Sequence, residues 1–146
     1  MAAMKGTLSL RKKQFEEFFN NKEGSPTKFS ITTLTEEDQK LFGVHSPDLW
    51  LSRISLDAHL EKHPEIGLND YLKIPEIVRN ADIWGGHKER RFLLITFGDV
   101  AYRAAIKATQ DHSEAWFLSL VVSPKQKPPK GAVLLRKGTG GSGWRP

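Results

Sequence analysis

Three apolar runs follow one another closely in the second half of the chain, and they constrain the fold more than any other feature. Residues 91–97, 100–109 and 115–122 are rich in β-branched and aromatic residues, a composition that favours strands. A Gly-Asp pair is all that separates the first two runs, and a five-residue loop over 110–114 separates the last two. Connections this short join antiparallel neighbours, so the three runs predict consecutive strands of an antiparallel sheet.

Two short helices are expected ahead of these strands. Ser55 can cap a helix over 56–62, which must end before Pro64 because the residue before a proline avoids the helical region. A second helix is expected over 70–78, and Pro75 predicts a break or kink within it.

Strand-like residues over 48–54 and 82–84 flank the two helices. This order of elements predicts an α+β fold in which two short helices pack on a four-stranded antiparallel sheet. We expect this α+β domain over residues 48–122, between an N-terminal helical extension over 1–47 and a basic Pro/Gly-rich tail over 123–146.

The two extensions differ in pattern. Residues 9–20 place Leu and Phe at helical spacing and predict an amphipathic helix. Residues 29–34 alternate like a short strand, and Thr35 can cap a helix that ends near Phe42. In the tail, prolines exclude a central strand, residues 131–135 can form an edge strand, and the Gly/Ser-rich end is expected to be flexible.

The net charge is concentrated in the tail. Of the 22 basic residues in the 146-residue chain, six lie in residues 123–146, which contain no acidic residue, so 16 basic residues face 17 acidic ones in the remainder. A basic tail favours nucleic acid or another polyanion through a salt-dependent attraction that has no sequence preference. A solvated tail that only keeps the protein soluble explains the same composition.

Composition also excludes several classes of protein. There is no cysteine, which rules out disulfides and thiolate metal sites. The N-terminus has no apolar run of the signal-peptide kind, and apolar runs of about five residues are far shorter than the ~20 that a membrane span needs. We therefore expect a cytoplasmic protein with no membrane partner.

An ordered set of motifs between Leu49 and Val122 resembles a known group of nucleases. The set consists of Lys62-His63-Pro64-Glu65, Asp70-Tyr71, Ile74-Pro75-Glu76-Ile77 and Tyr102-Arg103-Ala104-Ala105-Ile106-Lys107. In this order the motifs look like the phage-associated nuclease domains of the barnase/EndoU/colicin/RelE class. Such domains form the toxin portion of phage head-morphogenesis proteins and of related polymorphic toxins.

The resemblance covers about half of the chain and implies a small α+β fold with metal-independent, cofactor-free RNA cleavage. It implies RNA as the partner, with tRNA and ribosome-bound RNA as candidate targets, and a cognate inhibitor or a phage protein as a candidate protein partner. It also implies action in a bacterial cytoplasm, with or without delivery by a phage. The residues before Leu49 and after Val122 match no group.

Metal-free RNA cleavage by the 2′-hydroxyl needs a base, an acid and groups that hold the charge of the phosphorane. His63 lies in the motif that carries the resemblance and suits the first two roles; the alternative is a helix-end histidine bonded to a carbonyl. His59 lies four residues earlier on the same helix face, where it contacts RNA or sits part-buried on the sheet. This spacing also suits a metal ion, but no third ligand is evident, so we expect no metal site.

Strand pairing predicts which residues share a sheet face. If 110–114 form the loop, Lys107 pairs with Phe117, Ala105 with Ser119, and Arg103 with Val121. Alternation then gives one face with cations, hydroxyls and a ring that fits phosphates and bases: Arg103, Lys107, Thr109, Phe117 and Ser119. The other face is expected to be core, with Tyr102, Ile106, Trp116, Leu118 and Leu120. A plain solvated face with solubilising charges is the alternative for the first set.

The sequence therefore predicts a catalytic group made of His63, Arg103, Lys107, Thr109 and Ser119. Further RNA contacts are expected from His59, Arg91, Phe117, Lys125, Lys127 and Lys130. An active nuclease requires His63, Arg103 and Lys107 to converge on a concave surface. Two other functions stay open, namely a catalytically inactive relative that binds nucleic acid or a phage partner, and an assembly or adaptor protein without a nucleic-acid role.

Overall fold

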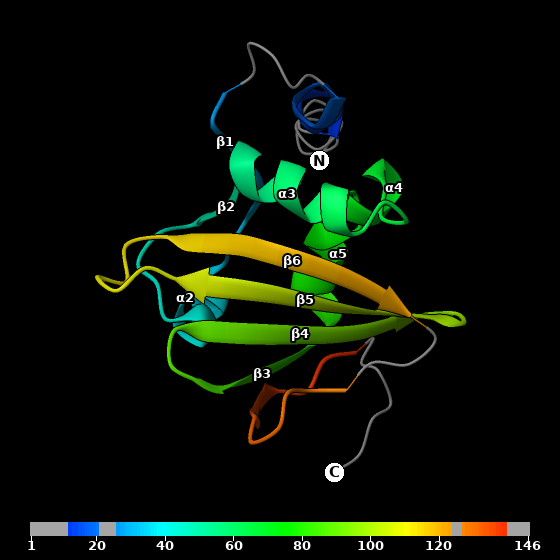
Figure 1. Ribbon diagram of the computed structural model, residues 1–146. Coiled ribbons are helices and arrows are strands. Elements are labelled where there is room, and N and C mark those ends of the chain that lie inside the picture. The colour runs from blue at the N-terminus through cyan, green and yellow to red at the C-terminus, as the bar shows by residue number, and fades with distance from the viewer. Residues whose placement is uncertain (1–11, 21–25, 124–126, 140–146) are drawn as a thin grey trace, which may run out of the picture.

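A curved sheet organises the protein in the computed structural model, which describes residues 12–20, 26–123 and 127–139 (Figure 1). Within those residues the sheet has seven strands. They are β1 (Lys28–Thr33), β2 (Asp48–Ser52), β3 (Asp82–His87), β4 (Arg90–Phe97), β5 (Val100–Ala108), β6 (Ala115–Ser123) and β7 (Val133–Arg136).

The strand order across the sheet is β1-β2-β6-β5-β4-β3-β7. Every neighbouring pair is antiparallel except β2 and β6, which run parallel. The predicted α+β class is confirmed, but the sheet is larger than the four antiparallel strands expected and is mixed. The difference arises because β1, β2 and β7 join the antiparallel centre at its two edges.

The described helices are short, as the prolines and glycines predicted. They are α2 (Glu36–Phe42), α3 (Arg53–Lys62), α4 (Leu68–Tyr71) and α5 (Ile74–Asn80), with a further helix over residues 12–20. The helix expected over 70–78 is divided into α4 and α5, and Pro75 lies in the first turn of α5, where its missing N–H costs nothing.

One of the two predicted helix caps is confirmed, and the other lies at a different serine. Thr35 caps α2 and forms a capping box with Asp38, as expected, and Gly43 ends that helix in the left-handed conformation with φ of 72°. The cap of α3 is Ser52 instead of Ser55: the Ser52 hydroxyl accepts from the backbone N–H of Ser55 at 2.9 Å.

The register between β5 and β6 contains an irregularity that changes the predicted faces. Ala105 pairs with Ser119 as expected, but beyond a bulge Lys107 pairs with Trp116. The predicted pair of Lys107 with Phe117 is therefore wrong, because the extra residue in β6 reverses the alternation. Phe117 turns into the core, where it is 1% exposed, and Trp116 turns to the other face.

The main core lies on the face of the sheet that α2 and α5 cover, which we call the inner face. Figure 1 shows both helices behind the central strands, and α5 contacts β1 as well as β4, so the sheet curves around it. The largest fully buried side chains on this side come from both layers, among them Tyr71, Ile74, Ile77, Leu49, Leu93 and Phe117. The opposite side of the sheet is the outer face.

The helix over residues 12–20 packs by aromatic contacts. Phe15 and Phe18 are buried, and their rings lie 5.6 and 5.4 Å from the ring of Phe29 on β1. Phe15 also stacks on Tyr71 of α4 at 6.4 Å. The predicted amphipathic helix is thus confirmed over the described part of 9–20, and the flexible end predicted beyond Gly138 lies almost entirely outside the described residues.

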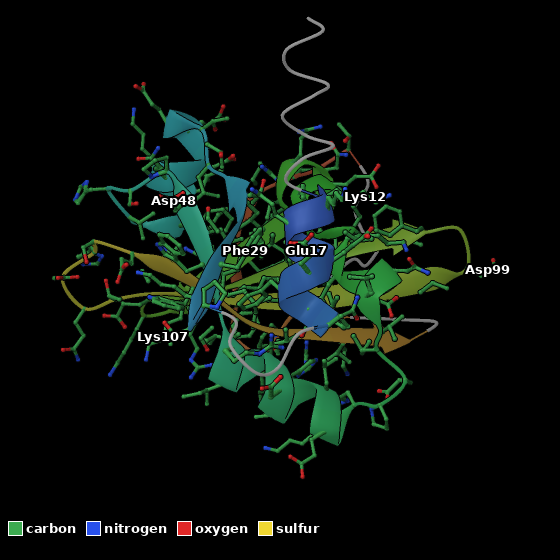
Figure 2. The ribbon with its side chains drawn as sticks, turned by 90° about the horizontal axis from the view of Figure 1, so that it is seen from above. Lys12, Glu17, Phe29, Asp48, Asp99 and Lys107 are labelled. Carbon is green, nitrogen blue, oxygen red and sulfur yellow. The ribbon has the colours of Figure 1, made fainter. Side chains whose placement is uncertain are left out.

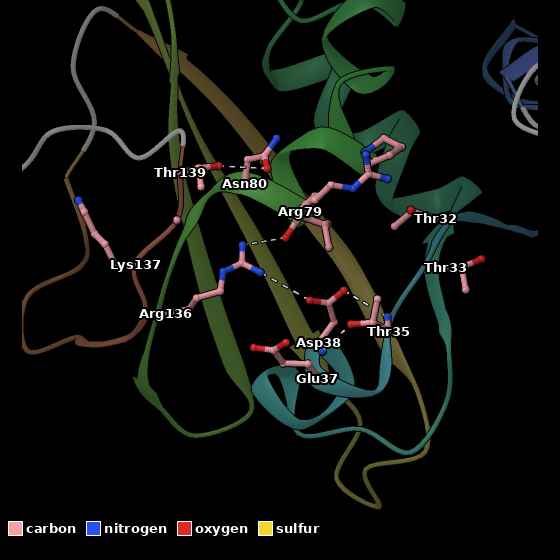
Figure 3. A pocket seen from close by; sticks show the side chains of 13 residues that line it. Thr32, Thr33, Thr35, Glu37, Asp38, Arg79, Asn80, Arg136, Lys137 and Thr139 are labelled. Atoms are coloured by element: carbon pink, nitrogen blue, oxygen red, sulfur yellow. Dashed lines mark hydrogen bonds and ion pairs between the residues drawn. The ribbon is translucent and has the colours of Figure 1, made fainter. Parts of the chain in front are cut away.

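Arg136 joins β7 to the two inner helices (Figure 3). Its Nη2 donates to the carbonyl oxygens of Val78 and Ala81 at 2.9 and 2.7 Å, and its Nη1 lies 3.5 Å from the Asp38 carboxylate. A helix end leaves carbonyls without partners inside the helix, and the guanidinium supplies the missing donors for α5. The last described strand, α5 and α2 are therefore held at one point.

We expect Arg136→Ala to lower the free energy of unfolding by about 3 kcal/mol, because two part-buried carbonyls and a carboxylate lose their partner together. Urea unfolding followed by circular dichroism measures this. The exposed Arg79 borders the same region and provides the control, since Arg79→Ala should stay within about 0.5 kcal/mol of wild type. Equal stability of the two variants would contradict the assignment.

Candidate nucleic-acid interface

Helix α3 covers an edge of β6 that the sheet leaves open. The parallel strand β2 pairs with β6 only at Leu49–Ala115 and Trp50–Trp116, after which the chain turns into α3. His59 on α3 then bonds the backbone of β6: its Nε2 lies 2.7 Å from the Leu120 carbonyl oxygen. The imidazole therefore takes the place of a missing strand neighbour.

His59 is 8% exposed, and burial lowers the pKa of its imidazole, although the bond to Leu120 opposes this in part. The neutral ring can donate from Nε2 to the Leu120 carbonyl. Because this ring is enclosed and already bonded, the predicted RNA contact at His59 is corrected to a structural role in fixing α3 on the sheet.

His63 lies one turn further on, at the exposed end of α3. Its ring centroid is 4.7 Å from that of His59, and its Nδ1 is 3.1 Å from Oε1 of Glu65. The Glu65 backbone amide, and after it the His63 ring, lower the pKa of the Glu65 carboxyl. An ionised carboxylate that accepts a hydrogen bond from Nδ1–H leaves Nε2 of His63 as the basic nitrogen.

Arg103 lies at the same level of the sheet as this histidine pair. It pairs with Val121, the residue next to the Leu120 that holds His59, and its side chain is on the outer face. Ser119 lies on the same face, paired with Ala105, and is partly exposed. Arg103 and Ser119 therefore lie on the outer face at the level where α3 covers the edge of β6, whereas the His59 ring contacts Tyr71 of the inner-face core.

Lys107 and Thr109 lie toward the opposite end of the strands. Lys107 is exposed and pairs with Trp116, four residues from Leu120, a separation of about 13 Å along β6. Figure 2 shows Lys107 toward one end of the sheet and the Asp99 turn at the other. In this register Lys107 does not converge with His63, so that prediction is wrong.

Thr109 is engaged in the β5–β6 loop. Its hydroxyl bonds the Asp111 carboxylate at 2.7 Å and accepts from the Glu114 N–H at 3.1 Å. Hydrogen bonds from Ser113 and then Thr109 lower the pKa of the Asp111 carboxyl to about 2. Thr109 thus shapes the loop, and no contact ties it to the histidine pair.

Two of the predicted RNA contacts turn inward. Arg91 lies on the inner face, where its Nε donates to the Leu41 carbonyl at 2.8 Å and its Nη1 to the Lys88 and Arg90 carbonyls. Burial lowers the pKa of its guanidinium. Arg91 therefore fixes α2 on the sheet, and Phe117 belongs to the core, so both are corrected to structural roles.

Two of the three tail lysines that were predicted to contact RNA lie within the described residues. Lys127 and Lys130 are exposed in the segment that leads to β7, and Lys125 lies outside the described residues.

A pocket of about 390 Å³ lies between α2, α5 and the end of β7 (Figure 3). Arg136, Lys137 and four threonines are among its lining residues, and none of the predicted catalytic residues is. In the described part of the chain, no cluster of three or more His, Cys, Asp or Glu side chains could hold a metal ion. No helix within those residues is long and apolar enough to cross a membrane.

Comparison of the chain with protein-family models, with curated proteins and with solved structures finds no match in any of the three. The chemistry of the site therefore rests on geometry. That geometry adds one residue to the predicted site: Glu65, which follows His63 across a proline in the motif Lys62-His63-Pro64-Glu65.

His59 should make stability depend on pH. The pKa of His59 is lower in the folded state than in the unfolded state, so at acidic pH the unfolded chain binds more protons at this residue than the folded chain. The stability contributed by the neutral ring is therefore fully present above the unfolded-state pKa, which is near 6.5, and decreases as the pH falls below it. We expect His59→Gln, which keeps a donor for Leu120, to reduce the loss of stability between pH 7.5 and 5.5. Urea midpoints at the two pH values measure this. His45→Gln, at an exposed loop position, should behave as wild type, and an unchanged pH dependence in His59→Gln would be the contrary result.

Proposed function

We propose that the protein is a metal-independent endoribonuclease of the toxin type, in which His63 with Glu65 acts beside the cationic outer face of the sheet. The observation that supports this most directly is the geometry of the pair. The His63 ring is partly exposed and its Nδ1 is held by a carboxylate, while Arg103 lies on β5, beyond β6, at the level of Val121.

The proposed reaction uses one imidazole for proton transfer. Nε2 of His63 takes the proton of a ribose 2′-hydroxyl, whose oxygen attacks the adjacent phosphorus. The bond from phosphorus to the 5′-oxygen breaks, and the imidazolium returns the proton to that oxygen. The products are a 2′,3′-cyclic phosphate and a 5′-hydroxyl, so atoms and charges balance without a metal ion.

Arg103 is the group that we assign to the developing charge. A guanidinium can offer two parallel N–H donors to phosphate oxygens, and it stays charged at every working pH. The carboxylate of Glu65 keeps the His63 ring oriented and stabilises the imidazolium that forms. Lys107, about 13 Å away along the strand, takes a role in binding RNA instead of in the reaction.

RNA binding without cleavage is the second candidate. It is favoured by the same separation, because Lys107 and His63 do not meet in one hollow and the exposed cations of the outer face can hold RNA without acting on it. In that case the basic residues would still attract RNA with a strong dependence on salt.

We expect the wild-type protein to cleave single-stranded RNA in the presence of EDTA. His63→Ala should lower kcat at least about 100-fold, because a general acid–base group contributes this much, and Glu65→Gln should lower it by a smaller factor. Lys107→Ala should raise KM and leave kcat near wild type. The rate of product formation from a fluorescent RNA of about ten nucleotides measures all three.

His45→Ala is the matched control, since this histidine lies in a loop and is exposed. Full activity of His63→Ala would remove the site assignment. A wild-type protein that binds the RNA but leaves it intact under all conditions would select the second candidate.

A further inference from the structure

Two tryptophans lie side by side on the outer face, at the end of the sheet away from His63. Trp50 on β2 pairs with Trp116 on β6, and their ring centroids are 6.4 Å apart with an angle of 36° between the planes. Both side chains are partly exposed, in contrast to Trp84, which is 8% exposed. The bulge that sends Phe117 into the core is what places Trp116 here.

A lysine lies over these rings. Nζ of Lys28 is 4.1 Å from the ring centroid of Trp50 and 5.7 Å from that of Trp116, close enough for cation–π attraction. The same ammonium is 3.4 Å from a carboxylate oxygen of Glu114. The Lys28 side chain is 41% exposed and that of Glu114 35%, so water and salt weaken the ion pair and the lysine can leave the ring at little cost.

The row of paired residues continues from aromatic rings into cations. Trp116 pairs with Lys107, and Lys107 pairs with Arg90 on β4; both cations are exposed. Neighbouring strands are about 4.8 Å apart, so the row Trp50, Trp116, Lys107 and Arg90 extends over about 14 Å. Rings for bases beside cations for phosphates are the combination by which proteins hold single-stranded nucleic acid.

Ordinary packing explains this arrangement less well. The main hydrophobic core lies on the inner face, and on the outer face the two tryptophans keep aromatic surface in contact with water while packing on each other, whereas Leu94, which pairs with Arg103, is fully buried there. Lys28 lies over the Trp50 ring in the free protein, so the ring presents an accessible π face to a cation.

We propose that Trp50 and Trp116 form a base-stacking subsite for single-stranded RNA, with Lys107 and Arg90 on the backbone phosphates and Lys28 displaced from the ring as a base takes its place. The choice of RNA rests on the function proposed above, which this inference deepens by naming the substrate class. Bases must be unpaired to stack on side chains, so the subsite selects single strands over duplexes. The stacked base is not the one at the cleaved bond, because Trp116 lies about 13 Å along β6 from Leu120, the anchor of His59.

Binding of a fluorescein-labelled, fully 2′-O-methylated ten-nucleotide oligouridine tests this inference, because that RNA cannot be cleaved by its own 2′-hydroxyl. Anisotropy at low salt in EDTA should show about tenfold weaker binding for Trp50→Ala and for Trp116→Ala. Trp50→Phe and Trp116→Phe retain a ring and should stay within about threefold of wild type. A blunt RNA duplex of the same length should bind more weakly than the single strand.

A second measurement does not depend on how well the alanine variants fold. Unlabelled oligouridine should quench the tryptophan fluorescence of the wild-type protein, and the doubly substituted Trp50→Phe/Trp116→Phe protein should lose this quenching while it keeps Trp84 and Trp144. Absence of quenching in the wild type, or equal affinity of folded alanine variants, would overturn the subsite.

The outcome for the nuclease proposal is separate. His63→Ala should bind the methylated RNA like the wild type, since the ring lies outside the stacking subsite. Stacking without any cleavage would leave the subsite standing and remove the proposed reaction. Cleavage that does not depend on the two tryptophans would leave the proposed reaction standing and remove the stacking subsite.

Discussion

The hydrogen bond from the His59 ring to the Leu120 carbonyl joins the helical layer to the sheet, and the position of the proposed site depends on it. Since β2 leaves β6 after two paired residues, the remaining edge of β6 would have exposed backbone groups. By covering this edge, α3 acquires a fixed position, and its last turn carries His63 to the level of Arg103. A missing strand therefore creates the place for the imidazole pair.

Arginines that the sequence presents as surface charge are used inside the protein. Arg53 donates to the Phe18 carbonyl, Arg91 to that of Leu41, and Arg136 to two carbonyls at the end of α5. In each case a guanidinium joins elements that no strand pairing connects. The positive charge available to a polyanion is consequently smaller than the net charge of +5 suggests, and it is restricted to particular positions such as Lys107 and Arg90.

Local signals in the sequence predicted most of the elements. Pro64 ends α3, Pro75 separates α4 from α5, and Thr35 with Gly43 delimits α2, because these residues act on their own backbone. The parallel pairing of β2 with β6 could not be predicted in this way, since it joins residues more than sixty positions apart. The bulge in β6 could not be predicted for another reason. Loop length fixes the register of two strands only if both are regular, and one extra residue in β6 exchanged Phe117 and Trp116 between the faces.

The contacts of Arg136 also give the fold an order in time. Asp38 and the carbonyls of Val78 and Ala81 leave the ribosome well before the guanidinium that joins them, because β7 comes after all the other strands. A nascent chain that ends before residue 136 can form the antiparallel hairpins, whose partners are close in sequence, but not this junction. Vectorial synthesis therefore delays the final locking of both inner helices until the last described strand has emerged.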